Sequence, residues 1–488
     1  MMFLNKSWMK PSLLSLMGVF IWGGALTYAI DGAAQAQQSP SVTIGKKALA
    51  AGYKSMFTCS AIFNGGKTKD QIAAHELTNA YPDFEAAFAA VEVAEIDRAQ
   101  KLVSVAFAEN TLPRLSVWRE HLGCTALPQG ADRSFIAHLP NIHLDAPEIN
   151  PADQLWPIGD KLPNAPLPNS VDTDQLDAAV KGAFAGEFGG VTSAVVVIKN
   201  NRLITEHYLE GYDIYTSQRT WSVAKSIGVS VIGAAAQKGI LDVSEKAALS
   251  EWARPRDPRG EITIENLLHM GSGLNSDPAG NRTDQIYFGG GLAAQYATKN
   301  PLEVPPATRW RYANNDTMLA VKALRVRMDN DQDFWEFPFK SLLHKIGMYH
   351  TVPEIDWGGD FILSSQVWTT ARDLARLGQL YLNDGIWQGE RILPQGWSDY
   401  VSAPAPAQPL NRQGEAASTP GRGYGAQFWR YENYPGVPEG TYAALGNRGQ
   451  FIIIVPSENV VIVRRGYDYQ GERFDGPAFT RRILSAFE

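Results

Sequence analysis

The stretch from Thr220 to Gly233 most constrains what this chain can fold into. Ser222 and Lys225 stand three residues apart, directly before an apolar run at positions 227–233. Such a run predicts a buried helix, and residues three apart share a helical face, so the amine of Lys225 can reach the hydroxyl of Ser222. Burial lowers the pKa of a lysine and lets its amine accept a proton. The pattern therefore predicts a serine nucleophile with a lysine base.

Ser-x-x-Lys is a short pattern, and it occurs a second time at residues 7–10. The alternative interpretation makes Ser222 a helix cap and Lys225 a surface lysine. The neighbouring sequence favours catalysis, because Lys225 stands between a tryptophan and an apolar helix, where an unpaired lysine would be costly.

The overall composition is that of a globular protein with a substantial core. The chain has 488 residues with 44% hydrophobic and 19% charged residues, so we expect two or three domains. A net charge of −7 and the lack of a Lys/Arg run argue against a nucleic-acid partner. Eight scattered histidines without a ligand spacing predict no metal site, and the spacing of Gly421, Gly423 and Gly425 is wrong for a nucleotide loop, so no cofactor is expected.

The first 36 residues have the pattern of a signal peptide. Lys6 and Lys10 precede a largely apolar stretch at positions 13–30, and Ala-Gln-Ala at 34–36 offers a cleavage site. The alternative is an uncleaved membrane anchor, since the apolar stretch is near the lower limit for spanning. We expect cleavage, export to the periplasm, and no stable membrane insertion afterwards.

Export bears on the redox state of Cys59 and Cys124, which are the chain's two cysteines. In an oxidising compartment we expect them to form a disulfide, worth about 4 kcal/mol on the chain-entropy model. The alternative, a nucleophilic cysteine, has little support because the one histidine nearby in sequence is His121.

The chain divides into an N-terminal unit at residues 37–145, a Pro-rich linker at 146–170 that we expect to lie along the surface, and a larger part at 171–488. Hydrophobic periodicity predicts helices at 70–79, 84–92, 172–184, 262–270, 317–327 and 479–487, and strands at 101–107, 192–199, 203–209, 424–431, 450–455 and 460–464. Strands at both ends of the larger part, with a helical insert between them, predict an α+β fold. In it, one antiparallel sheet flanked by terminal helices faces an all-helical half across a cleft.

Tyr312 and Asn314 precede a predicted helix and can both point into that cleft. A tyrosine hydroxyl can carry protons if a neighbouring cation lowers its pKa, and Lys225 would be such a cation. The alternative is that Tyr312 is a wall aromatic and that Asn315 or Asp316 caps the helix.

Small residues at positions 443–450, including Ala444 and Gly446, let the backbone approach a substrate closely. A backbone N–H from this segment could form an oxyanion hole with that of Ser222. The alternative is a simple turn.

Three ordered motifs carry a resemblance to a known family: Ser222-x-x-Lys225, Tyr312-x-Asn314, and the Gly-rich edge strand with Gly446-Asn447-Arg448-Gly449-Gln450. Residues 267–274 and 368–376 add to it. Over about residues 170 to 488 the chain resembles the serine β-lactamase/D,D-peptidase-like superfamily. Within that superfamily it is similar to class C β-lactamase-related hydrolases, especially the 6-aminohexanoate-dimer (nylon-oligomer) hydrolase group.

The resemblance implies that Ser222 is acylated, that Lys225 is its base, and that Tyr312 is the general acid/base that also serves the leaving group. Asn314 would orient the substrate amide or Lys225, and the backbone of Ser222 and Ala444 would hold the oxyanion. Relatives that hydrolyse β-lactams carry Lys-Thr-Gly on the edge strand, where this chain has Thr441-Tyr442-Ala443 or nearby residues. That substrate-binding lysine is absent, and Arg448 is the nearest cation in sequence.

We therefore expect a serine hydrolase that acts on small esters or linear amides. The alternatives are a cell-wall D,D-peptidase, a β-lactamase-type enzyme, or a penicillin-binding-like protein that binds without turnover.

Overall fold

The computed structural model describes residues 42–145, 150–276, 287–409, 421–469 and 471–488. The predicted signal peptide and residues 146–149 of the predicted linker lie outside the described residues. Residues 42–488 form one compact unit.

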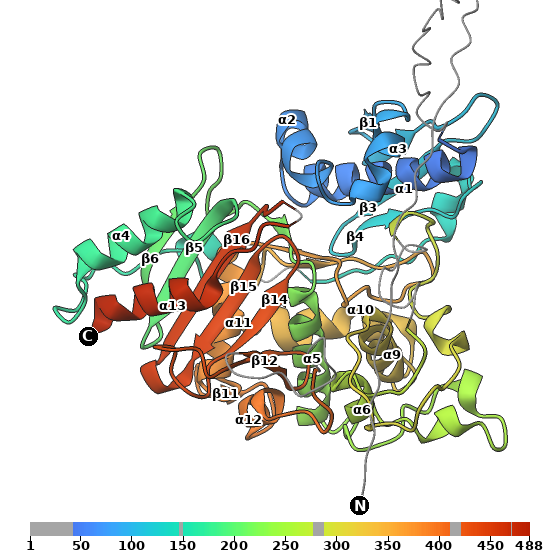
Figure 1. The fold of residues 1–488 in the computed structure, drawn as a ribbon. Helices are drawn as coiled ribbons and strands as arrows, with labels where there is room; N and C mark the ends of the chain where they lie inside the picture. Colours follow the sequence, from blue (N-terminus) through green and yellow to red (C-terminus); the bar gives the residue numbers. More distant parts are fainter. Residues whose placement is uncertain (1–41, 146–149, 277–286, 410–420, 470) are drawn as a thin grey trace, which may run out of the picture. The chain divides into compact units, whose positions relative to one another are not determined.

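A seven-stranded antiparallel sheet organises the larger part of the chain (Figure 1). Its strand order is β12-β13-β14-β15-β16-β5-β6, so strands from both ends of this part meet at β16 and β5. The strands are β5 (Thr192–Lys199), β6 (Arg202–Tyr208), β12 (Gly421–Tyr424), β13 (Trp429–Glu432), β14 (Tyr442–Gly446), β15 (Gln450–Val455) and β16 (Val460–Gly466).

Each face of the sheet packs against helices that lie far apart in sequence. The terminal helices α4 (Thr173–Phe184) and α13 (Gly476–Leu484) share a hydrophobic cluster with one face. Helices α5 (Val223–Gln237) and α11 (Ala371–Leu382) pack on the other. The predicted α+β architecture, an antiparallel sheet between terminal helices and a helical half, is confirmed.

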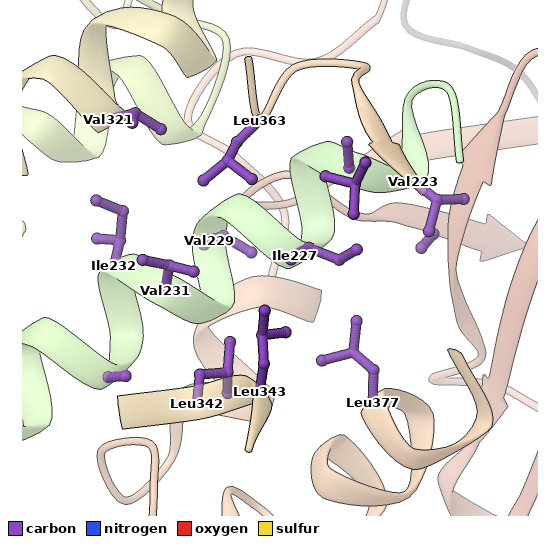
Figure 2. Packing of buried hydrophobic residues seen from close by; sticks show 14 of the residues in the cluster. Val223, Ile227, Val229, Val231, Ile232, Val321, Leu342, Leu343, Leu363 and Leu377 are labelled. Carbon is purple, nitrogen blue, oxygen red and sulfur yellow. The ribbon is translucent and has the colours of Figure 1, made fainter. Parts of the chain in front are cut away.

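Helix α5 runs through the centre of the core. All of its residues from Val223 to Ala235 are buried. Figure 2 shows its valines and isoleucines surrounded by Val321, Leu342, Leu343, Leu363 and Leu377, which come from other segments. Burial on every side fixes this helix firmly, which makes it a rigid base for Ser222 at its first turn.

The helical half follows α5 in sequence. It contains α6 (Ile264–Leu268), α9 (Asn314–Arg325), α10 (Asp331–Pro338) and a π-helical turn (Phe339–Leu343), and α12 (Trp397–Ser402) lies beside the sheet. This part of the chain also contains two small sheets. One has the strand order β7 (Gln218–Arg219), β9 (Val367–Thr369) and β8 (Val352–Pro353), and the other is a hairpin of β10 (Ile386–Trp387) and β11 (Glu390–Arg391).

Local signals explain several boundaries. Asn200 and Asn201 both adopt left-handed backbone, which a tight β5–β6 hairpin requires. Asp172 caps α4 by accepting the N–H of Gln175. The strand predicted at 424–431 is wrong: two strands, β12 and β13, turn back on each other there, because the apolar pattern does not reveal the reversal.

The N-terminal unit has its own small layer structure. Helix α1 (Ile44–Phe63) packs on a four-stranded antiparallel sheet of β1 (Glu95–Asp97), β2 (Leu102–Val105), β3 (Arg114–Arg119) and β4 (Gly123–Ala126). The helix predicted at 70–79 is shorter than expected. It consists of α2 (Lys69–Gln71) and a π-helical turn (Ile72–Glu76), while α3 (Glu85–Ala89) falls within the helix predicted at 84–92.

A disulfide joins Cys59 on α1 to Cys124 on β4. Beside it, the buried carboxyl of Glu354 accepts hydrogen bonds from Ser60 (2.7 Å), Asn64 (2.8 Å) and the N–H of Cys124 (2.9 Å). The N-terminal unit is thereby fastened to the larger part of the chain.

The described part of the predicted linker does not simply lie on the surface. Trp156 and Asp160 are buried, and Arg376 of α11 donates to the carbonyls of Pro157 and Gly159, both at 2.7 Å. The boundary at 146–170 stays a prediction of the sequence. Among the helices that the structure describes, none is both long and apolar enough to cross a membrane.

Candidate active site

Ser222 stands at a tight turn where strand β7 passes into helix α5. Trp221 has φ of 50°, which is a strained conformation for a large side chain. Ser222 occupies the N-cap position, but its side chain makes no capping hydrogen bond. Its side chain is partly exposed, whereas every following residue to Ala235 is buried. The turn thus presents the hydroxyl at the surface of the core.

Lys225 lies one helical turn below Ser222 and is only 1% exposed. Its Nζ is 3.2 Å from Ser222 Oγ, 2.5 Å from Asn314 Oδ1 and 2.7 Å from the carbonyl oxygen of Ser364. Burial lowers the pKa of Lys225 from 10.5 to about 7. The alternative of a surface lysine is therefore wrong.

These three contacts suit the charged amine, which donates to all three oxygens, and they also suit the neutral amine. A carbonyl oxygen only accepts, so Asn314 Oδ1 and the Ser364 oxygen take up both N–H bonds of an uncharged amine. The remaining lone pair is then available to the hydroxyl hydrogen of Ser222. The geometry therefore allows the neutral amine of Lys225 to take a proton from Ser222 while its two N–H bonds are held by Asn314 and Ser364.

Tyr312 lies on the loop before α9 and reaches the same hydroxyl. Its hydroxyl lies close enough to that of Ser222 for the serine to lower its pKa, and Lys225 Nζ is 4.9 Å from its ring centroid. The predicted lowering of its pKa by Lys225 is wrong. Burial raises the pKa of Tyr312, and the low pKa of Lys225 weakens the charge that was to stabilise a tyrosinate. Tyr312 is thus a protonated hydroxyl at neutral pH.

Aromatic rings form a cluster around Tyr312. Trp429 lies 5.5 Å and Tyr424 6.1 Å from its ring, and Trp310 contacts all three at 5.4 to 6.2 Å between centroids. The indole N–H of Trp310 is buried, and within the described ranges no hydrogen-bond partner reaches it. This cluster gives the site an apolar wall with one available donor.

The end of strand β14 touches the Ser222 turn at Gly446. A Cβ added to Gly446 would lie 2.4 Å from the carbonyl oxygen of Thr220 and 3.2 Å from the N of Val223. Only glycine permits this approach. Ala444, two residues earlier and fully buried in the core, lies about 7 Å farther along the strand. The structure therefore brings Gly446, rather than Ala444, to the turn.

Two buried arginines that the sequence did not indicate support the turn. Arg465 of β16 donates to the carbonyls of Gln218 (2.9 Å), Arg219 (3.0 Å) and Thr369 (2.7 Å), which anchors β7 just before Ser222. The guanidinium of Arg219 lies 3.6 Å from the ring centroid of Trp221. Such residues act through backbone carbonyls and ring faces, for which a sequence has no motif.

Arg448 does not take the place of the missing lysine. It is buried and donates to the carbonyls of His75, Asp468 (3.3 Å) and Tyr467 (3.4 Å). Its guanidinium therefore ties the β14–β15 turn to the N-terminal unit.

A comparison with protein families matches residues 178–464 to the Beta-lactamase family model. The chain belongs to the β-lactamase family. The match begins within α4 and ends within β16, so it includes Ser222, Lys225, Tyr312 and Gly446, while the N-terminal unit lies outside it.

The proteins that this chain is similar to include a hydrolase of 6-aminohexanoate dimer and a carboxylesterase. Over 309 residues, 56% of this chain and 72% of the other, the sequence is 23% identical to 6-aminohexanoate-dimer hydrolase of Paenarthrobacter ureafaciens. Two solved structures share the fold: a putative β-lactamase of Bacteroides dorei (TM-score 0.52, 18% identity, 65% of this chain and 99% of that one) and a family VIII carboxylesterase (TM-score 0.51, 13% identity, 66% and 98%). The predicted resemblance is confirmed at the level of the superfamily.

Proposed function

We propose that this protein is a serine hydrolase that cleaves small esters or linear amides through an acyl-enzyme. The observation that carries the proposal is the lysine amine of depressed pKa, held by two carbonyl oxygens with its third position at Ser222 Oγ. A residue buried in this way, within contact of a partly exposed serine, is suited to general-base chemistry rather than to stability.

In the acylation step, neutral Lys225 accepts the proton of Ser222 as its Oγ attacks the substrate carbonyl carbon. Asn314 holds the amine in position and gains a stronger hydrogen bond once the amine is charged. Collapse of the tetrahedral intermediate breaks the bond to the leaving group and leaves the acyl group on Ser222.

Tyr312 is the proton carrier to the leaving group. Its hydroxyl contacts Ser222 and its ring contacts Lys225, so it can donate its own proton to the departing oxygen or nitrogen and be reprotonated from Lys225. In deacylation the same groups deprotonate a water molecule, which attacks the acyl carbon and releases Ser222.

The oxyanion is stabilised by backbone N–H groups at the place where Gly446 meets the Ser222 turn. The N–H of Ser222 is one donor. We assign the second to the residue after the closest approach, Asn447, in preference to Ala444, because Ala444 is buried two residues away from the contact.

The missing edge-strand lysine favours linear esters and amides over β-lactams, which carry a carboxylate beside the scissile bond. The relative from Paenarthrobacter, a dimer hydrolase by name, supports a linear amide as one substrate class. The aromatic cluster around Tyr312 supports an apolar acyl or leaving group.

The pH dependence should follow Lys225. Its amine must be neutral to act as base, and its pKa of about 7 means that protonation removes the base as the pH falls. We expect kcat/KM for a non-titrating ester to reach a plateau above about pH 8 and to fall roughly tenfold per unit below pH 6. A pH–rate profile checks this, and a flat profile from pH 5 to 9 would contradict the role of Lys225.

Substrate preference gives a second test. A charge-assisted hydrogen bond to a carboxylate is worth about 1.5–3 kcal/mol, or roughly ten- to hundredfold in kcat/KM. Without the lysine, we expect a p-nitrophenyl short-chain ester to be hydrolysed at least tenfold better than a chromogenic cephalosporin. A preference for the cephalosporin would mean that another cation serves its carboxylate and would favour a β-lactamase.

The disulfide supports our further proposal that the protein is exported. Disulfides persist in oxidising compartments, and the Cys59–Cys124 bond is buried within the N-terminal unit. The periplasm is the compartment that the sequence pattern of residues 1–36 predicts.

A further inference from the structure

Arg219 lies shortly before Ser222 in the chain and contacts the N-terminal unit as well as the Ser222 turn. Its side chain is 2% exposed. Its guanidinium carbon is 3.6 Å from the ring centroid of Trp221, 4.2 Å from that of Phe57 on α1, and 4.7 Å from that of Tyr287. The Nη1 and Nη2 atoms are buried, and neither has a hydrogen-bond partner in the described part of the chain. Ring faces therefore hold this guanidinium, because they attract a desolvated cation.

The same guanidinium reaches the segment that holds the lysine base. Arg219 Nε donates to the carbonyl of Ser365 at 3.3 Å. The preceding carbonyl, that of Ser364, accepts from Lys225 Nζ at 2.7 Å. Arg219 thus contacts both the residue before the nucleophile and the residue after the one whose carbonyl holds the base. A shift of its guanidinium would move Ser222 and Lys225 relative to each other.

A second route leads from the N-terminal unit to this segment through Glu354. Its Oε1 accepts from Ser60 at 2.7 Å and from Asn64 at 2.8 Å, at the end of α1. Its other oxygen, Oε2, accepts from Gln366 Nε2 at 3.0 Å. Both routes therefore end on residues 364–366, which include the carbonyl that holds the base.

The Ser222 turn depends on such support because its backbone is strained. Trp221 has a positive φ, which a large side chain keeps only where its surroundings hold it in place. Lys225 Nζ must also stay within hydrogen-bond distance of Ser222 Oγ, from which it is separated by 3.2 Å. A displacement of about 1 Å at a reacting group can lower a rate about 100-fold. Contacts that fix this turn thus act on the rate as well as on stability.

We propose that the N-terminal unit positions the catalytic residues: Phe57 holds Arg219, and Arg219 fixes the Ser222 turn and the carbonyl segment behind Lys225. This proposal rests on the proposed function. Phe57 lies outside the family match at residues 178–464, so this support comes from a part of the chain that the family model does not contain. A buried guanidinium whose Nη atoms lack partners among the described residues is costly to stability. This cost favours a positioning role for Arg219 over a purely stabilising one.

Phe57→Leu tests the proposal, because it removes the ring from Arg219 and keeps an apolar side chain. With p-nitrophenyl valerate we expect kcat to fall about 10- to 100-fold while KM changes less than about twofold. The rate constant for fluorophosphonate labelling should fall by a similar factor, since labelling needs only the nucleophile and its base. Phe57→Tyr keeps the ring face and should retain at least about a third of the wild-type kcat.

Phe88→Leu is the matched control. Phe88 lies on α3 in the same hydrophobic cluster as Phe57, and its ring is not among those that contact Arg219 in the described part of the chain. This variant should lower the stability of the same unit and leave kcat within about twofold. An equal loss of kcat in both variants, a kcat within about twofold in Phe57→Leu, or a loss confined to KM would overturn the proposal.

Arg219→Gln approaches the same contact from the other residue and serves if Phe57→Leu does not fold. It removes the planar cation, so we expect the same loss of kcat, again with little change in KM. An Arg219→Gln protein that keeps its kcat within about twofold would contradict the positioning role.

Failure of the proposed function would look different. If the wild-type protein hydrolyses no ester and resists the fluorophosphonate, Ser222→Cys still tests the positioning. Cys59 and Cys124 are bonded to each other, so the thiol that this substitution introduces is the one free thiol of the chain. A neighbouring Lys225 promotes its thiolate. We expect iodoacetamide to alkylate it at least about threefold faster than in the double variant Ser222→Cys/Phe57→Leu, and equal rates would refute the proposal.

Discussion

Ser222→Ala is expected to abolish turnover, with a loss in kcat of at least about 10⁴-fold and no labelling by a fluorophosphonate. The variant removes the hydroxyl that we propose is acylated, while the backbone N–H groups of the turn remain. Because Ser222 is partly exposed and caps nothing, the free energy of unfolding should change by less than about 1 kcal/mol. Steady-state kinetics, a labelling gel and denaturant unfolding measure the three quantities.

Ser230→Ala is the matched control. Ser230 lies on the same helix, and its hydroxyl contacts the Ser226 carbonyl and Tyr381 away from the site. Its loss should leave labelling intact. Persistent labelling of Ser222→Ala would contradict the nucleophile, and an intact protein that binds esters without turnover in the wild type would favour a penicillin-binding-like role.

Tyr312→Phe should lower kcat by roughly 10² to 10⁴, the usual range for loss of a general acid/base. The ring and its aromatic neighbours stay, so KM should change little, and only the hydroxyl at Ser222 is lost. The effect should be larger for an amide than for a p-nitrophenyl ester, because the amide nitrogen must be protonated to leave, whereas nitrophenolate leaves unaided.

Tyr431→Phe controls for the loss of a buried hydroxyl, since Tyr431 lies in the hydrophobic cluster on the other face of the sheet. It should retain full kcat. If Tyr312→Phe also kept kcat within about threefold on an amide, Tyr312 would be a wall residue.

Patterns that rest on period and spacing were predictable from the sequence. The apolar run after Lys225 predicts α5, and the three-residue spacing predicts the contact with Ser222 that the structure shows at 3.2 Å. The Asn200-Asn201 turn predicts the β5–β6 hairpin. These features depend on residues that lie close together in the sequence, so their spacing is enough to predict them.

Features that depend on tertiary surroundings could not be predicted. The pKa of Tyr312 is raised because neighbours from other segments bury it, which outweighs one nearby amine. The acceptor at Ser364 is a backbone oxygen without a sequence signature. Gly446 rather than Ala444 meets the Ser222 turn because of the sheet register, and residue size alone does not set the register.

The N-terminal unit shows the same limit. Helix α1 was not predicted, because it is buried on most sides and so lacks a one-sided apolar pattern: most of its residues from Ala48 to Ile62 are buried. The contacts that this unit makes near the Ser222 turn could not be predicted either. Tyr81 contacts Trp221 and Arg448 binds His75, and the two residues of each pair lie far apart in sequence.

Mass spectrometry of a trapped acyl-enzyme tests the proposed chemistry most directly. The protein is mixed with excess p-nitrophenyl valerate, quenched in acid within seconds, and digested for peptide mapping. We expect one added valeryl group, located on Ser222, and none in Ser222→Ala. A valeryl group on another residue, or rapid hydrolysis in Ser222→Ala at the wild-type rate, would contradict a serine hydrolase built on Ser222 and Lys225.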